Sequence, residues 1–241
     1  MVSLKRRLTS LAIAVLALLM LFTANTPAHA ATLTVEKLPF VNNFATARFK
    51  LLTTITMGEQ QIVSYGAGAA VMPDRSSLWL ASNASDQLVH MIQIGQTMYQ
   101  RIGDGEWKQS DAALGDMQFQ PLSAQFNQLQ QFADAIYDLG PTNVGDTPTE
   151  HYQVWLSGTR VLAMNGAATD DLPMEARTAL EGLHFKYDFW IGTQDSFLYQ
   201  QNTELLFAAG TLSADAPAMQ VDVLMTFSDI NDPTISVNAP N

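Results

Sequence analysis

Apolar and polar side chains alternate along several stretches of the chain, which is the pattern of strands with one buried face. Between residues 45 and 57, Phe49, Leu51 and Ile55 would point one way and Arg48 and Lys50 the other. The alternation returns in two later stretches, with Phe185, Tyr187 and Phe189 inward in the first and Val221, Val223, Met225 and Phe227 inward in the second. Shorter pieces separated by Gly, Pro and Asp predict further strands at residues 61–72, 77–81, 88–94, 98–102 and 152–156.

A different spacing between Pro121 and Leu139 predicts one long amphipathic helix. Its apolar positions, at gaps of four and three, are Leu122, Phe126, Leu129, Ala133 and Ile136. Pro121 suits a first helical turn and Gly140-Pro141 a stop, so residues 140–150 are expected to be a loop that returns to the sheet. A second, short helix is predicted from Pro173 to Glu181. Together these elements predict an α+β fold, a mostly antiparallel sheet with helices on one face.

The N-terminus has the three parts of a cleaved signal peptide. Three basic residues at positions 5–7 precede an apolar run from Leu11 to Phe22, and the small residues Ala28 and Ala30 follow. A run of about a dozen apolar residues is short for a permanent membrane span. We therefore expect residues 1–30 to be a signal peptide, residues 31–241 to be one domain, and the mature protein to be secreted or periplasmic.

Charge and cysteine content narrow the classes of partner. The formal charge is −11, and it becomes −14 without residues 1–30, because that segment holds three basic and no acidic residues. Such a surface repels phosphate backbones, so nucleic acid is not an expected partner. The chain has no cysteine, which excludes disulfides, thiolate metal sites and a lipid attached to an N-terminal cysteine. The mature protein is therefore not expected to be lipid-anchored.

Candidate catalytic and metal-binding residues are few. His90, His151 and His184 each stand alone in sequence, without a second ligand at a metal-binding spacing. Gly66 and Gly68 lack the lysine and the helix of a nucleotide-binding loop. The acidic clusters at residues 170–171 and 229–232 could hold calcium, but turn residues are the simpler interpretation of both. No catalytic residue, metal or cofactor is expected.

The most distinctive feature is the inward apolar stripe on every strong strand. Large side chains facing one helix layer are typical of an ordinary core, and they are equally what a sheet curved around an apolar guest would need. On the second interpretation the cavity would be lined by Phe49, Leu51, Ile55, Phe126, Leu129, Phe185, Tyr187, Phe189, Val221, Val223, Met225 and Phe227.

Several segments, taken in order, resemble the LppX/LprG-type lipoprotein family, which shares the half-barrel fold of the lipoprotein carrier LolA. The matching segments are FATARFKLLTTI, MYQRIGDGEWKQ, HYQVWL, FWIGTQDSFLYQQ and VLMTFSDINDPTISVNAP. They are distributed along the chain, and the resemblance covers nearly all of residues 31–241. The resemblance implies a strongly curved antiparallel sheet whose concave face is covered by helices, with a hydrophobic cavity that receives acyl chains. The predicted helices 121–139 and 173–181 would form the lid.

One departure from this family concerns the transport step. Its mycobacterial members carry a lipidated cysteine after the signal peptide, whereas this chain has none. The expected function is therefore a free, exported carrier of lipid or lipoprotein acyl chains, without catalysis. A membrane protein or envelope protein could be a further partner. Two alternatives stay open: an envelope sensor or adaptor that binds a protein partner through the same fold, and a secreted hydrolase with a dispersed site that uses one of the three histidines as base.

Overall fold

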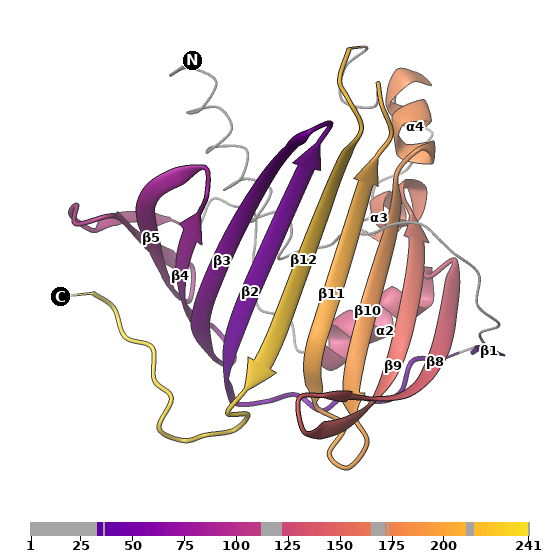
Figure 1. Cartoon of the computed structure of the whole chain (residues 1–241). Helices are drawn as coiled ribbons and strands as arrows, with labels where there is room; N and C mark the ends of the chain where they lie inside the picture. Colours follow the sequence, from indigo (N-terminus) through magenta and orange to yellow (C-terminus); the bar gives the residue numbers. More distant parts are fainter. Residues whose placement is uncertain are drawn as a thin grey trace.

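The computed structural model of the chain describes residues 33–35, 37–111, 122–164, 172, 174–210 and 215–240. In these residues twelve strands form one sheet in the order β1-β8-β9-β10-β11-β12-β2-β3-β4-β5-β6-β7 (Figure 1). All neighbouring pairs are antiparallel. The predicted signal peptide lies outside the described residues.

The strands have the following bounds: β1 Leu33–Thr34, β2 Thr46–Met57, β3 Gln60–Val71, β4 Arg75–Ser82, β5 Ser85–Ile94, β6 Thr97–Ile102, β7 Lys108–Asp111, β8 Ala135–Val144, β9 Thr147–Ser157, β10 His184–Gly192, β11 Leu198–Phe207 and β12 Met219–Ser228. The described helices are α2 Leu122–Phe132, α3 Gly158–Met164 and α4 Met174–Glu181.

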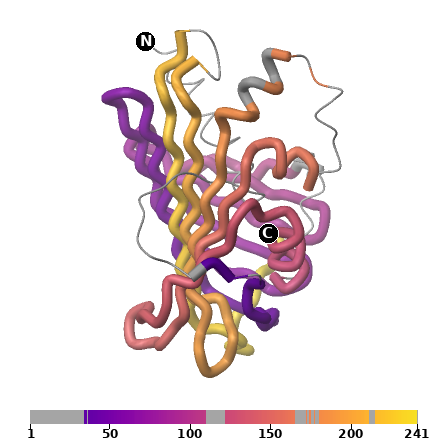
Figure 2. The backbone as a smooth tube through the Cα atoms, turned by 90° about the vertical axis from the view of Figure 1, so that its right-hand side faces the viewer, coloured from indigo at the N-terminus to yellow at the C-terminus, as the bar shows by residue number. Residues whose placement is uncertain are grey.

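The sheet is strongly curved, and α2 and α3 lie on its concave side (Figures 1 and 2). The side view shows that β4 to β6 turn from the plane of the other strands toward the side of these helices. Phe126 of α2 packs on Phe189 of β10, which identifies the sheet face that the helices cover. We call this concave face the inner face and the opposite one the outer face. The predicted α+β half-barrel, with helices over its concave face, is confirmed.

Two inward glycines on β3 let neighbouring strands approach closely. A methyl group on Gly68 would overlap the carbonyl oxygen of Ser77 and the ring of Phe49, and one on Gly66 would crowd Leu78. Because glycine has no Cβ, these large side chains can occupy the space over β3.

The predicted long helix is wrong in its C-terminal half. Helix α2 ends at Phe132, and Ile136 belongs to β8. Ile136 lies opposite Val154 of β9 and is buried at 5% exposure. The side chain of Asp134 accepts a hydrogen bond from the backbone N–H of Ser157, which fixes the turn between α2 and β8. The predicted helix was too long because Ile136 fits the helical spacing of the preceding residues and also the alternation of a strand.

The predicted loop at residues 140–150 is also wrong. Residues 135–157 form a hairpin of β8 and β9 that turns at Gly145 and Asp146. Gly140, with φ of 85°, lies where the register shifts, and this local irregularity gives a strand the appearance of a helix stop. The helix predicted over 173–181 is confirmed as α4, whereas α3 was not expected.

Candidate functional site

The twelve residues predicted to line a cavity all lie in one hydrophobic cluster. They come from β2, α2, β10 and β12, and eleven of them are buried, with exposures from 0% to 8%. The twelfth, Met225, is partly buried and packs against the others. The period-two alternation therefore placed the ten strand residues on the correct face, and the helical spacing placed Phe126 and Leu129 against it. Contact with a ligand stays a prediction for all twelve.

Cross-strand register continues the cluster from one half of the sheet to the other. Val221 of β12 lies opposite Ile55 of β2 on one side and opposite Leu205 of β11 on the other. Leu205 in turn lies opposite Phe185 of β10. Because directly opposed residues share a face, these four side chains form an apolar row across the inner face. Leu205 was not predicted, since the sequence around it does not alternate strictly.

The inner face extends beyond the predicted residues onto β4 and β5. Leu78 and Leu80 of β4 are buried at 3% and 8% exposure, and both belong to the same cluster. They lie opposite Met91 and Val89 of β5, which pack against it. The strand signal at 77–81 was visible in the sequence, but nothing local indicated that it joins the face formed by strands 100 or more residues later.

The described helices cover mainly one end of this face. Helices α2 and α3 contact β9, and the rings of Phe126 and Phe189 lie 4.5 Å apart between centroids. Gln128 of α2 donates a hydrogen bond to the carbonyl oxygen of Met164, which ties α2 to α3. The inner face of β12, β2, β4 and β5 thus extends beyond the strands against which α2 and α3 pack.

A short polar row interrupts the apolar inner face. Thr203 of β11 lies opposite Tyr187 of β10, and Thr53 of β2 lies opposite Ser64 of β3. Val223 separates the two pairs at the same level. Thr53 is 3% exposed, and its hydroxyl has no hydrogen-bond partner among the described residues. A buried hydroxyl without a partner is costly, so this position would gain from a polar atom of a bound molecule.

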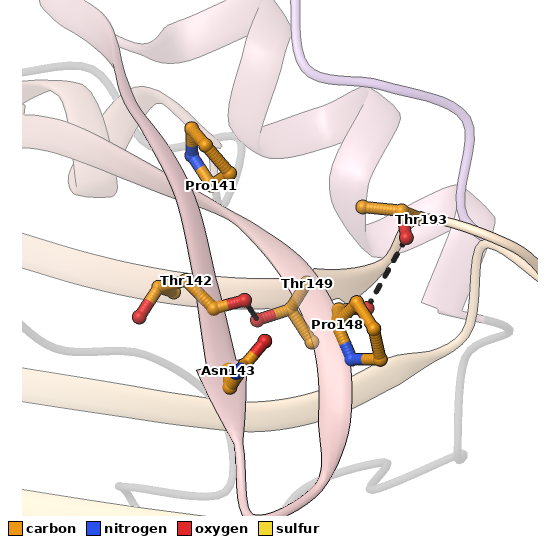
Figure 3. Close-up of a pocket in the computed structure, with 6 residues that line it drawn as sticks. All are labelled: Pro141, Thr142, Asn143, Pro148, Thr149 and Thr193. Atoms are coloured by element: carbon orange, nitrogen blue, oxygen red, sulfur yellow. Dashed lines mark hydrogen bonds between the residues drawn. The ribbon is translucent and has the colours of Figure 1, made fainter.

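A surface pocket among the described residues lies elsewhere, beside the tips of the β8–β9 and β10–β11 hairpins. It has a volume of about 490 Å³ and is lined by Pro141, Thr142, Asn143, Pro148, Thr149 and Thr193 (Figure 3). The hydroxyl of Thr149 donates a hydrogen bond to the carbonyl oxygen of Thr142. The hydroxyl of Thr193 donates one to the carbonyl oxygen of Pro148. Its wall combines two prolines with threonine and asparagine side chains, so it is not the uniformly apolar lining that an acyl chain would need. None of the twelve predicted residues lines it.

The outer face carries a charged network around Asp188 of β10, which is only 5% exposed. Its carboxylate accepts hydrogen bonds from His151 and Gln153, each at 2.9 Å, and lies 3.4 Å from the ammonium group of Lys186. Lys186 also forms an ion pair with Glu204. Burial alone would raise the pKa of Asp188, but the bonds from His151 and Gln153 and the charge of Lys186 outweigh it and lower that pKa.

His90 forms a second outer-face cluster, far from the first. Its Nε2 lies 3.0 Å from the hydroxyl of Ser77, whereas its buried Nδ1 has no hydrogen-bond partner in the described residues. Burial, and then the positive charge of Arg101, lower the pKa of His90. A serine–histidine pair without a carboxylate to orient the imidazole lacks one part of a hydrolytic triad.

These pieces of hydrolase chemistry do not converge. The His151–Asp188 pair bridges β9 and β10, and the Ser77–His90 pair bridges β4 and β5. Six strands lie between β9 and β5 in the sheet, and seven spacings of about 4.8 Å place the two strands about 34 Å apart along the surface. His184 lies at the start of β10.

The acidic cluster at residues 229–232 is explained by local interactions. Asp229 pairs with Arg48 at 3.4 Å, and Asp232 accepts hydrogen bonds from the backbone and side chain of Thr234. Among the described residues no three acidic or histidine side chains are placed to share a metal ion. The cluster at 170–171 lies outside the described residues.

Comparisons with known proteins place the chain beside lipoproteins and LolA-like proteins. No family model and no curated protein matches it. Among solved structures, lipoprotein LppX from Mycobacterium tuberculosis is 13% identical, with 81% of this chain and 90% of LppX covered and a TM-score of 0.45. LprF from Mycobacterium bovis is 12% identical, with 82% and 90% covered and a TM-score of 0.43. A LolA superfamily protein from Nitrosomonas europaea is 8% identical, with 83% and 90% covered and a TM-score of 0.30. These solved structures are of the LppX and LolA type that the sequence segments resemble.

Proposed function

We propose that the protein is an exported, non-catalytic carrier that binds the acyl chain of a lipid or lipoprotein between the inner face and the helices. The observation that supports it best is the extent of the inner face. One apolar cluster runs from β4 to β8, whereas α2 and α3 pack mainly against β9 and β10. An apolar layer of this size, buried between a curved sheet and the segments packed on it, suits a long apolar guest once these layers separate.

The free energy of transfer is large enough for such binding. Each methylene group removed from water contributes about 0.8 kcal/mol, so a chain of some sixteen carbons gains on the order of 10 kcal/mol before costs. The main cost is opening the packed cluster, in which Val221 is 0% and Phe189 1% exposed. The guest would therefore enter by displacing the helix layer rather than by filling a preformed hole.

The non-catalytic part of the proposal is supported by the separation of the histidine clusters, which lie on the outer face at opposite ends of the sheet.

The exported location is supported by the signal-like N-terminal segment. The largest described helix, α2, has 11 residues, and no described helix is long and apolar enough to cross a membrane. The mass of the product recovered outside the cytoplasm should correspond to cleavage after Ala30.

Binding is tested by native mass spectrometry of the gently purified protein, together with a fluorescent fatty-acid probe. Wild type should carry lipid and bind the probe. Phe185→Asp and Val223→Asp, which place a charge on the inner face, should lose both. Thr226→Asp adds the same charge on the outer face of β12 and should bind normally.

A milder variant separates loss of binding from loss of folding. Met225 is only partly buried, so Met225→Gln should fold and still weaken probe binding severalfold. A wild-type protein that is lipid-free and ignores the probe, or a folded Met225→Gln that binds like wild type, would contradict the proposal.

A further inference from the structure

The outer face of β3 to β6 carries a group of exposed aromatic and apolar side chains. Tyr65 is 62% exposed, Trp79 38% and Leu88 43%. Trp107, between β6 and β7, and Arg101 of β6 lie beside them. We call these five residues the outer aromatic surface. Tyr65, Trp79 and Leu88 each expose a mostly apolar side chain on the same face. Single exposed apolar residues need no explanation, whereas a group of them marks a candidate interaction site.

Strand register places a cation at each end of this surface. Lys50 lies opposite Ala67, Ala67 opposite Trp79, Trp79 opposite His90, and His90 opposite Arg101. These ladder positions share one face and form a single row across β2, β3, β4, β5 and β6. The row therefore has a lysine at one end, an arginine at the other, and tryptophan and histidine between them.

Contacts within the surface hold the aromatic rings in place. The ring of Trp79 stacks on His90 with centroids 3.6 Å apart and planes 17° apart, and Trp107 lies 4.8 Å from His90. The guanidinium carbon of Arg101 lies 5.7 Å from the Trp79 ring centroid and 4.9 Å from that of Trp107. The rings are fixed before any partner arrives, so docking would cost little side-chain entropy.

The charge of this row is opposite to that of the whole chain, which is −11. Lys50 and Arg101 have no acidic residue between them in the row, and the buried Nε of Arg101 has no hydrogen-bond partner among the described residues. Three acidic residues are near this surface in sequence. Asp86 and Asp104 lie beside hairpin turns, and the exposed Glu106 directly precedes Trp107 and is followed two positions later by Lys108. A protein that repels anions overall thus presents a cationic, aromatic surface at one place.

We propose that the outer aromatic surface docks the protein onto an anionic phospholipid membrane. Tryptophan and tyrosine combine an apolar ring with a polar edge and favour the headgroup region of bilayers, where leucine can insert and arginine and lysine meet phosphate. This surface is opposite the proposed acyl-chain site, so membrane docking and lipid uptake can each fail without the other.

Vesicle sedimentation tests the proposal directly. The full-length gene is expressed, the exported protein is purified, and it is mixed with phosphatidylcholine vesicles with or without phosphatidylglycerol. Wild type should sediment with the anionic vesicles only, and salt should weaken binding. Tyr65→Ser and Arg101→Gln should each lower the partition coefficient, and the double variant should lower it at least about fivefold.

Two matched variants control for the chemistry of the changes. Phe40, 71% exposed, and Arg160, whose side chain is 54% exposed, lie outside the outer aromatic surface. Phe40→Ser and Arg160→Gln should therefore bind vesicles like wild type, and all variants should keep the wild-type circular dichroism spectrum and fatty-acid binding. The proposal is overturned if the wild-type protein does not bind anionic vesicles, whether or not it binds an envelope protein. It is also overturned if the control variants lose as much vesicle binding as the test variants.

Discussion

Asp188 is a buried charge with several partners, and its environment determines what replacing it would do. The carboxylate is buried and bonded to His151 and Gln153, with Lys186 at 3.4 Å. Removing one partner of such a group leaves the others buried without compensation. The network on the outer face therefore has a structural interpretation that needs no ligand.

Asp188→Asn should lower the free energy of unfolding by about 3 kcal/mol at neutral pH, measured by urea denaturation. Asp229→Asn is the control, because Asp229 forms an ion pair with Arg48 in which both side chains are about half exposed. That control should change stability by less than about 1 kcal/mol. The Asp229 backbone has a φ of 50°, which asparagine tolerates.

The effect of Asp188→Asn should also depend on pH. Because the folded protein holds the pKa of Asp188 below its usual value, the carboxylate stabilises the fold at pH values above the unfolded pKa of about 3.9. This contribution is lost as the pH falls through the lower, folded pKa. The difference between wild type and variant should therefore shrink below about pH 4, and a difference that stays constant to pH 2 would contradict this assignment.

At the scale of single elements, β3 depends on its inward glycines. Gly68→Ala should destabilise the protein by about 1–3 kcal/mol, although alanine is the better residue for a regular strand, because the added methyl group overlaps Ser77 and Phe49. Ala67→Val, the neighbouring position on the outer face, is exposed and should change stability by less than about 0.5 kcal/mol. Equal effects of the two changes in thermal melts would show that the close approach over Gly68 is unimportant.

The elements also show what local sequence can and cannot specify. Strands β2, β10 and β12 were predictable with their inward sides, because alternation over ten residues has one solution on a half-buried sheet. The end of α2 was not, since Ile136 fits both a helical and a strand pattern and only its position opposite Val154 decides between them. Helix α3 is seven residues long and has too few turns to show a periodic pattern.

At the scale of the whole molecule, the candidate site arises from pairings between distant segments. Strand β12 lies beside β2, more than 160 residues earlier in the chain, and joins the two halves of the inner face. The alternation and helical spacing identified the twelve predicted inner-face residues. They could not assign Leu78 and Leu205 to the same inner face, nor place Thr53 on that face. Register across the sheet is set by long-range packing, which no local pattern records.

The same scale explains how one sheet could serve two partners. Its inner face is apolar and covered at one end by helices, and its outer face carries charged and aromatic clusters. A carrier needs a surface that holds its guest away from water and another that finds the membrane where the guest is collected or delivered. Because successive side chains of a strand point to opposite faces, the two surfaces lie on opposite sides of one sheet.

Photo-crosslinking with a diazirine-bearing fatty acid tests the central claim most directly. After irradiation and digestion, adducts should map to peptides containing β10, β12 and α2, and an excess of unlabelled fatty acid should abolish them. Adducts confined to the outer face, or none at all on a folded protein saturated with probe, would contradict the account of an acyl chain between sheet and helices.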